Sequence, residues 1–381
     1  MKAVRLALLL PLCLGMAATA QEPVEFSGLT WSARGEWRLA EHLGRPAVLM
    51  RNAVLELQDV WFNNGTIEFE VAASGHRSFT GVAFRKRNGS YEDFYLRPHQ
   101  SNRFDALQYT PVWNDASAWQ LYPEHNAAFD IPRDAWLTVK LVVRDGRLEA
   151  FLGGGYEPAL VVGRLRGPQK QGRIALRSFF PDADRMPDFY PNAFTGFRFT
   201  PDDSYRRTEP EIESGDARII DRWALSQAFP GTPEQIEAYP TELVAKAEWI
   251  GIDSEPTGRT NLAITGGVPA SEDLRLKLAR VVLTSDRERD LKLNYGFSDR
   301  VSIFLNGRLL LTSDNTYRSR SLRYLGVMTL ENDAIVLPLE KGDNELLFAV
   351  TEAFGGWGLT ARLGALDGVR WRPTPPTVEQ P

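Results

Sequence analysis

The sequence predicts an all-β protein, built as two tandem β-sandwich (jelly-roll) domains that follow a signal peptide. Short runs of alternating apolar and polar residues recur along the chain, and Gly, Asp, Asn or Pro bounds most of them, as is typical of sandwiches. The helix–strand alternation of a nucleotide-binding α/β domain does not occur in the sequence. The length of 381 residues exceeds what one hydrophobic core usually serves, so two domains are expected.

The first 20 residues have the pattern of a signal peptide. Lys2 and Arg5 form a basic start, residues 6–14 form an apolar run, and Ala18 to Ala20 form a small-residue cleavage site. The apolar run is too short to span a bilayer, and no later segment has the ~20 apolar residues that a membrane helix needs. We therefore expect cleavage after Ala20 and an exported protein, periplasmic or extracellular, without membrane insertion.

Composition limits the partners. Cys13 is the only cysteine, so the mature chain is expected to lack disulfides and to depend on its hydrophobic cores. Loss of Lys2 and Arg5 with the leader changes the formal charge from −5 to −7, which argues against nucleic acid or an anionic membrane as a partner. The 10 Trp and 20 Phe residues suit both β-rich cores and surfaces that stack on sugars.

The expected domains are a signal peptide at 1–20, a first sandwich at 21–200, a linker at 201–216, a second sandwich at 217–372 and a disordered tail at 373–381. The linker is predicted where alternation stops and Pro, Arg and Glu accumulate. The strands expected in the first sandwich include 66–71, 80–86, 91–99, 136–143, 148–152 and 173–176, with a glycine-rich loop at 163–172.

The second sandwich is expected to begin with an entry strand at 219–229 and to contain a helix near 233–248 that Pro240 would interrupt. Its further strands are predicted at 274–285, 290–298, 301–312, 334–339 and 344–351. Asn306-Gly307 separates two apolar runs and is the strongest local signal for a tight β-hairpin.

The run from Tyr91 to His99 has two different faces. Phe94 and Leu96 fall on one face, and the odd-numbered residues fall on the other, because successive side chains of a strand point to opposite sides. If the neighbouring runs pair with it, a set of polar and aromatic side chains shares one surface. The predicted ligand-binding residues are Arg85, Tyr95, Arg97, His99, Gln108, Gln120 and Tyr122.

Arginine and glutamine donate to hydroxyl groups in fixed geometry, and tyrosine combines a stacking ring with a polar hydroxyl. This combination predicts a surface that binds a carbohydrate or a related glycan. An ordinary wet sheet face, with Arg97 paired to Asp93, also explains the pattern.

The motifs GVAFR, YEDFYLRPHQS, DALQYTPVW and AWQLY resemble the concanavalin A-like lectin/glucanase superfamily, in its laminin-G-like and 3-keto-disaccharide-hydrolase-like branches. The resemblance covers Val24 to Thr200. It implies a sandwich with a ligand across the concave sheet, where Tyr95, Arg97 and His99 are expected. The fold does not imply an activity, because this sandwich hosts lectins, hydrolases and structural modules.

The sequence does not decide whether a reaction is catalysed at this surface. Glycosidases usually use two carboxylates beside the scissile bond, and Glu68-x-Glu70 lacks the third acid of the glucanase pattern. His99 and Asp93 are weak catalytic candidates, since a histidine can act as a base near neutral pH. No cofactor is expected. The four histidines lack zinc spacing, while Asp182, Asp184 and Asp202-Asp203 leave room for a structural calcium ion.

Farther along, NYGFSDRVSIFLNGRLLL, LPLEKGDNELLFAVTE and GGWGLTARL resemble the galactose-binding-like jelly roll that is attached to glycoside hydrolases. In such proteins this module often only supports its neighbour. The candidate loop contacts are Asp299, Tyr317, Arg318, Arg320 and Trp357, with Trp357 expected to pack in the core.

The leading interpretation is recognition of a glycan without catalysis. The alternatives are a glycoside hydrolase or lyase that acts on a (keto-)sugar bond at the same surface, and a scaffold that binds another exported protein.

Overall fold

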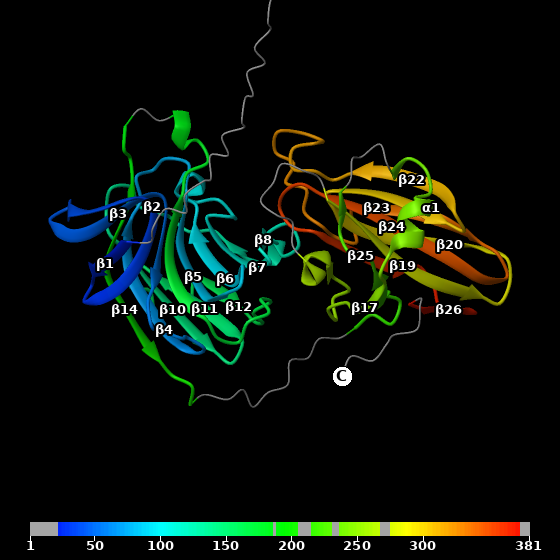
Figure 1. Cartoon of the computed structure of the whole chain (residues 1–381), viewed down its shortest axis with the longest axis horizontal. Helices are drawn as coiled ribbons and strands as arrows, with labels where there is room; N and C mark the ends of the chain where they lie inside the picture. Colours follow the sequence, from blue (N-terminus) through cyan, green and yellow to red (C-terminus); the bar gives the residue numbers. More distant parts are fainter. Residues whose placement is uncertain (1–21, 186–187, 205–214, 231–235, 267–274, 374–381) are drawn as a thin grey trace, which may run out of the picture.

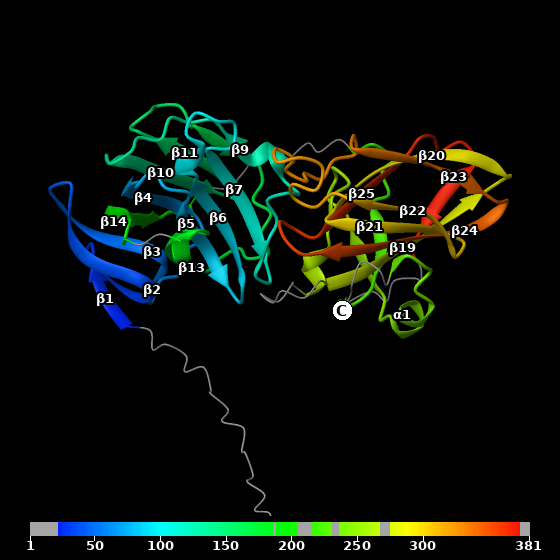
Figure 2. The same cartoon turned by 90° about the horizontal axis from the view of Figure 1, so that it is seen from above.

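The computed structural model describes residues 22–185, 188–204, 215–230, 236–266 and 275–373. The chain forms two β-sandwiches that lie side by side along the long axis of the molecule (Figures 1 and 2). The all-β, two-sandwich prediction is confirmed. The leader at 1–20 and nearly all of the expected tail at 373–381 lie outside the described residues.

The first domain is one long sheet folded into two layers. Its strands run in the order β12-β11-β10-β4-β14-β3-β13-β5-β6-β7-β8, with β1, β2 and β9 on side branches. The first residues of β14 pair with β3, and β14 pairs with β4 on its other side along Ala193–Pro201, with a register shift between Thr195 and Arg198, so β14 connects the two layers. The strands are β1 (Glu22–Phe26), β2 (Leu29–His42), β3 (Arg45–Leu57), β4 (Gly65–Ala72), β5 (Phe79–Arg87), β6 (Ser90–Leu96), β7 (Leu107–Trp113), β8 (Ala116–Ser117), β9 (Asn126–Ala127), β10 (Leu137–Arg144), β11 (Arg147–Leu152), β12 (Leu160–Val162), β13 (Arg173–Phe179) and β14 (Asn192–Pro201).

The core of the first domain lies between these layers. Phe94 and Leu96 of β6 are fully buried in it, together with Phe69 of β4 and Leu141 of β10. The odd-numbered residues of β6 point to the other side, as the alternation predicted, and form part of the outer face of the layer β3-β13-β5-β6-β7-β8. This outer face carries the candidate site.

The second domain is a sandwich of two separate sheets. One sheet has the order β17-β15-β19-β24-β21-β22, with β16 and β26 also paired to β19, and the other has the order β18-β25-β20-β23. A second core, which includes the buried Trp223, Phe348 and Trp357, fills the space between them. The strands are β15 (Arg222–Leu225), β16 (Phe229–Pro230), β17 (Ile250–Asp253), β18 (Thr260–Asn261), β19 (Arg275–Ser285), β20 (Arg289–Ser298), β21 (Arg300–Leu305), β22 (Arg308–Asp314), β23 (Asp333–Leu339), β24 (Gly342–Glu352), β25 (Gly358–Leu363) and β26 (Val369–Arg372).

A short helix, α1 (Thr241–Lys246), lies over the outer face of the larger sheet. Residues from the segment around it, among them Ile236 and Trp249, pack against Leu276, Leu278 and Phe304. The helix begins directly after Pro240, because proline lacks the N–H that a helix interior needs. The predicted entry strand at 219–229 is instead divided into β15 and β16.

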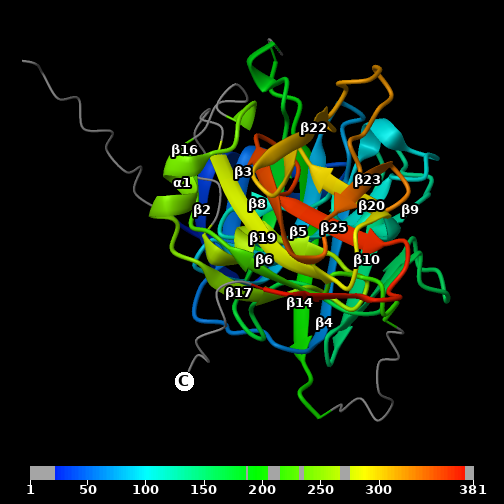
Figure 3. The same ribbon diagram turned by 90° about the vertical axis from the view of Figure 1, so that its right-hand side faces the viewer.

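Buried hydrogen bonds join the two domains. Gln120, between β8 and β9, makes four of them to the second domain: its N–H donates to the Gly355 carbonyl, and its carbonyl accepts from the N–H of Met328, both at 2.9 Å. Its amide donates to the Leu325 carbonyl at 2.9 Å and accepts from the Ser298 hydroxyl at 3.0 Å. Figure 3 views the molecule along its long axis, with the second domain in front. The docked arrangement brings loops of the second domain to the β8 edge of the first sheet.

No helix among the described residues is long and apolar enough to cross a membrane.

Candidate functional site

A pocket of about 380 Å³ lies where the outer face of the first sheet meets two loops of the second domain. The sheet residues come from β5, β6, β7, β8, β9 and β13. The second-domain residues come from the loop between β22 and β23 and from the loop between β24 and β25. The lining residues are Arg77, Phe79, Tyr91, Asp93, Tyr95, Arg97, Phe104, Asp105, Gln108, Ser117, Trp119, Pro123, Asn126, Arg177, Phe179, Pro181, Tyr317, Leu325, Val327 and Phe354.

Aromatic side chains from both domains form one wall of this pocket. Trp119 lies 6.0 Å from Tyr317 and 6.0 Å from Phe354, measured between ring centroids, and Tyr317 and Phe354 are 6.2 Å apart. Phe354 remains 58% exposed although it belongs to this cluster. Such a wall offers apolar ring faces to a ligand, while the indole and phenol retain polar groups.

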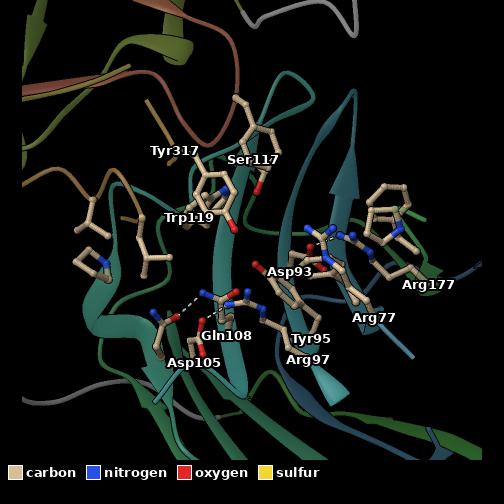
Figure 4. Close-up of a pocket in the computed structure, with 18 of the residues that line it drawn as sticks. Arg77, Asp93, Tyr95, Arg97, Asp105, Gln108, Ser117, Trp119, Arg177 and Tyr317 are labelled. Atoms are coloured by element: carbon tan, nitrogen blue, oxygen red, sulfur yellow. Dashed lines mark hydrogen bonds and ion pairs between the residues drawn. The ribbon is translucent and has the colours of Figure 1, made fainter. Parts of the chain in front are cut away.

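Two arginine–aspartate pairs form the polar floor on the sheet (Figure 4). Arg97 of the β6–β7 connection pairs with Asp105, and Arg177 of β13 pairs with Asp93 of β6. The arginine side chains are 13% and 22% exposed, whereas the aspartate side chains are only 6% and 2% exposed. The guanidinium groups therefore face the pocket, and each carboxylate orients one of them from behind.

Each arginine uses Nη1 for its aspartate, so Nη2 is left for a ligand. Arg97 also lies over the Phe79 ring, with 5.5 Å from its guanidinium carbon to the centroid, and Arg177 lies over the Tyr95 ring at 5.8 Å. These contacts hold the guanidinium planes in place by cation–π attraction. The floor is thus a rigid set of hydrogen-bond donors.

Burial raises the pKa of Asp93 to about 6, even though the neighbouring Arg177 acts to lower it. Loss of hydration penalises the charged carboxylate more than the single ion pair compensates. The preceding residue, Glu92, points to the core instead, where it accepts a hydrogen bond from the Tyr109 hydroxyl at 2.6 Å. Burial raises the pKa of Glu92 to about 7.

Three of the predicted binding residues lie in the pocket. Tyr95, Arg97 and Gln108 line it together, and the Gln108 amide donates to the Asn126 side chain at 2.8 Å. His99 does not line the pocket and packs behind Phe79, with 5.5 Å between ring centroids. Burial, and then the nearby Arg97 and Arg77, lower the pKa of His99 to about 4, so it is neutral and weakly basic at pH 7.

Arg85 lies elsewhere, which corrects its predicted position. The β5–β6 pairing shifts between Phe84 and Arg87, and Arg85 has φ of 52° there. The side chain is buried and donates to the Asn63 carbonyl at 3.0 Å and to the Asn64 side chain at 3.2 Å. The bulge breaks the alternation on which the prediction depended.

Gln120 and Tyr122 also lie outside the pocket, because the segment after β8 is not a strand and does not alternate. Gln120 is buried between the domains. The Tyr122 hydroxyl donates to Glu255 of the second domain, and its ring stacks on His125 at 5.6 Å. Both residues join the domains rather than line the candidate site.

Of the five second-domain candidates of the sequence analysis, Tyr317 lines the pocket, whereas Asp299, Arg318, Arg320 and Trp357 do not. Asp299 is buried, and its Oδ2 accepts from the N–H groups of Ala353 and Phe354 at 2.9 and 3.0 Å, so it fixes the loop that carries Phe354. Arg320 pairs with Asp333 at 3.5 Å.

The other two lie against aromatic groups. Arg318 lies over the ring of Tyr317, 4.9 Å from the centroid, and only Tyr317 of this pair faces the pocket. Trp357 is fully buried in the second core, as its expected packing role required.

Sequence reasoning missed several lining residues. Arg177 could have been found, because Ile174 and Leu176 are buried in the core and Arg177 falls on the opposite face of β13. Trp119 belongs to a quoted motif, but its position depends on an irregular segment. Phe354 could not be found, since only domain docking brings it to the sheet.

The Glu68 and Glu70 carboxylates, which the sequence analysis considered for glycosidase catalysis, and the carboxylates considered for calcium binding do not line the pocket. Glu68 and Glu70 pair with Arg198 and Arg45 at the surface of β4. In the part of the chain that the structure describes, no three His, Cys, Asp or Glu side chains gather closely enough to hold a metal ion. Asp182 pairs instead with Arg77 at 3.3 Å.

Comparisons with known proteins give weak likenesses only. No family model and no curated protein matches the chain. The carbohydrate-binding module CBM66 from Bacillus subtilis matches 44% of this chain and 94% of its own length, with 11% identity and a TM-score of 0.32.

Two further solved structures are similar over comparable shares. Domain 4 of AbnA, a GH43 extracellular arabinanase from Geobacillus stearothermophilus, matches 45% of this chain and 82% of its own length, with 10% identity and a TM-score of 0.31. The Bacillus licheniformis beta-glucanase matches 49% of this chain and 90% of its own length, with 8% identity and a TM-score of 0.30. At this level of similarity the comparisons assign neither a family nor a function to the chain.

Proposed function

We propose that the protein binds a carbohydrate in the pocket between the first sheet and the second-domain loops, without chemical conversion. The observation that carries the proposal is an aromatic wall, Trp119, Tyr317 and Phe354, that shares one pocket with a floor of oriented arginines. A sugar has apolar C–H faces and a rim of hydroxyl oxygens. The wall suits the faces, and the guanidinium donors suit the oxygens.

The size and composition of the pocket support a small polar ligand or one unit of a larger one. A volume of about 380 Å³ lies at the low end of the range typical of small-molecule sites. A glycan also agrees with export to the periplasm or the cell exterior, which the pattern of residues 1–20 favours. Export belongs to the same proposal.

A hydrolase or lyase is the second candidate, and the raised pKa of Asp93 is the observation that favours it. A carboxyl that titrates near pH 6 suits acid–base chemistry. Against this, Asp93 is paired with Arg177 and almost inaccessible, and the other pocket carboxylate, Asp105, is paired with Arg97. Both carboxylates are better placed to orient arginines than to reach a scissile bond.

A glycan-array screen of the protein, with product analysis on every hit, tests the proposal. Trp119→Ala should weaken binding at least about tenfold, because aromatic residues that fill a central contact carry much of the binding energy. Tyr156→Ala is the matched control, since Tyr156 is 99% exposed and lies away from the pocket.

Binding without product formation supports glycan recognition without catalysis, whereas product formation supports a hydrolase or lyase. Absence of binding to every glycan on the array, or wild-type affinity in Trp119→Ala, would overturn the proposal and favour a protein-binding scaffold.

A further inference from the structure

A second pocket, of about 610 Å³, adjoins the first on the same face of the sheet. The two pockets share Tyr91, Arg177 and Phe179 as lining residues. The second pocket is lined largely by polar groups, among them Arg34 of β2 and Lys86 of β5. The two pockets therefore adjoin at Tyr91, Arg177 and Phe179 and together form one extended path along the face of the sheet.

The two pockets overlap on β5, β6 and β13. Beyond these strands the first pocket extends over β7 and β8 to the second-domain loops, and the second pocket extends over β3 to Arg34 on β2. The second domain stands at the β8 end of this path, where Tyr317, Leu325 and Phe354 enter the lining of the first pocket only. The path is therefore walled at one end.

Buried contacts hold this wall in place. Gln120 bonds to Leu325, Met328 and Gly355, which lie on or beside the two wall loops. Asp299 holds the backbone N–H groups of Ala353 and Phe354. Breaking these buried hydrogen bonds would leave polar groups unsatisfied, so the wall is costly to displace.

We propose that the site recognises the end of a glycan chain, with the terminal unit in the first pocket and the next units in the second pocket toward Arg34. The second domain acts as an end wall that excludes internal segments of a long chain. The inference rests on the proposed carbohydrate-binding function and adds the part of the glycan that is bound.

The arrangement has two measurable consequences. Affinity should rise from a monosaccharide to a di- or trisaccharide as the second pocket fills, and then stay constant. The number of protein molecules bound per linear chain should not grow with chain length, because a chain has only one end of each kind.

The test is titration calorimetry of the full chain with linear gluco-, xylo-, manno-, arabino- and galacto-oligosaccharides, from one to six units, and with the matching polysaccharides. One bound protein per chain at every length is expected for the series that binds. A count that rises with chain length would overturn end recognition while leaving carbohydrate binding intact. Absence of binding to every series would count against the proposed function itself.

Two variants separate the two ends of the path. Arg34→Ala should remove the gain in affinity from the second pocket while monosaccharide binding stays unchanged, since Arg34 is not part of the first pocket. Phe354→Ala should weaken binding of the terminal unit at least about fivefold and let long chains bind more than one protein.

Leu322→Ala is the control for Phe354→Ala, because Leu322 lies on a loop of the same wall, is 84% exposed and does not line the pocket. It should bind like the wild type. If Phe354→Ala leaves both affinity and stoichiometry unchanged, the wall does not define the site and end recognition is wrong.

Discussion

At the scale of single residues, the candidate site uses charge pairs as orienting devices. Arg97 and Arg177 each have an aspartate behind them and an aromatic ring beside them. A guanidinium has a planar fork of donors, so fixing its plane also fixes the direction of the remaining N–H groups. The chemistry of the floor therefore depends on the geometry of arginine and not only on positive charge.

Arg97→Lys tests this dependence. Lysine keeps a positive charge near Asp105, which avoids leaving a buried carboxylate unpaired at a cost of about 3–5 kcal/mol. It loses the planar fork, so glycan affinity should fall at least about tenfold while the melting temperature changes little. Arg97→Ala should instead lower both affinity and stability. Wild-type affinity in Arg97→Lys, measured by calorimetry, would contradict a directional role for the guanidinium.

The raised pKa of Asp93 predicts that glycan binding depends on pH. Burial raises its pKa to about 6, so above that pH the carboxylate is charged and holds Arg177, and below it the proton weakens the pair. Glycan affinity should therefore fall as the pH drops through about 6. His99, with a pKa lowered to about 4, stays neutral across this window. Asp93→Asn should bind weakly at every pH and show no inflection near pH 6.

The contribution of Asp93 to folding stability should change with pH in the direction opposite to glycan affinity. Asp93 binds its proton more tightly in the folded chain than in the unfolded chain, where the pKa is about 3.9. Its favourable contribution is complete below the unfolded value and is lost as the pH rises through about 6. Glu92→Gln is the control: it should alter the pH dependence of unfolding, because burial raises the pKa of Glu92 to about 7, and leave the binding inflection in place.

Alternation in the sequence located the part of the site that lies on regular strands. Tyr95, Arg97 and Gln108 are in the pocket because the β6–β7 pair has an unbroken register, with Tyr95 opposite Gln108. Arg85 was misplaced at a bulge, and Gln120 and Tyr122 were misplaced after the last strand. The alternation of side chains predicts which face a residue occupies only where the pairing with the neighbouring strand is unbroken.

At the scale of elements, turn chemistry was the most reliable signal. Asn306 and Gly307 both have positive φ, 51° and 77°, between Leu305 and Arg308, which pair across the β21–β22 hairpin. This geometry is that of a type I′ turn, so the prediction is confirmed. The helix was also signalled locally, since it begins directly after Pro240.

Gly307→Val should destabilise this hairpin. A β-branched residue at φ of 77° is strained by about 1–3 kcal/mol, although no neighbouring atom blocks the added side chain. Gly307→Asn is the matched control, because asparagine tolerates the left-handed region. Chemical denaturation should show a clear loss of unfolding free energy for valine and a smaller loss for asparagine. Equal stability of both variants would mean that the turn relaxes without strain.

At the scale of the whole molecule, docking of the two domains completes the candidate site. The Tyr122 hydroxyl bonds Glu255, and the Arg259 guanidinium bonds both oxygens of Glu124, one of them at 2.9 Å. These partners are more than a hundred positions apart in the sequence. Local patterns do not specify such pairs, which is why Tyr317 was only a loop candidate and Phe354 was not foreseen.

The domain boundaries stay a prediction that proteolysis can test. The sequence places the linker at 201–216, so a protease should cut first between Asp202 and Gly215. Because buried hydrogen bonds join the domains, the two fragments should still elute together in gel filtration under native conditions. An early cut within 91–99 would contradict the assignment of that segment to a core layer.

Gln120→Ala tests whether docking controls the site without touching the ligand. The substitution leaves the Leu325 carbonyl and the Ser298 hydroxyl without their partner, at about 1–3 kcal/mol for each buried group. The loop between β22 and β23 loses its side-chain anchor at Leu325, although the backbone of residue 120 still bonds to Gly355 and Met328. Glycan affinity should therefore fall and the two nicked fragments should separate, while the cores stay folded. Gln227→Ala is the matched control, because among the described residues the Gln227 amide donates to the Lys246 carbonyl at 3.2 Å and accepts from the Glu248 N–H at 2.8 Å, both within the second domain. If Gln120→Ala keeps full affinity while its fragments dissociate, the first sheet binds the ligand alone, and the second domain has no part in the site.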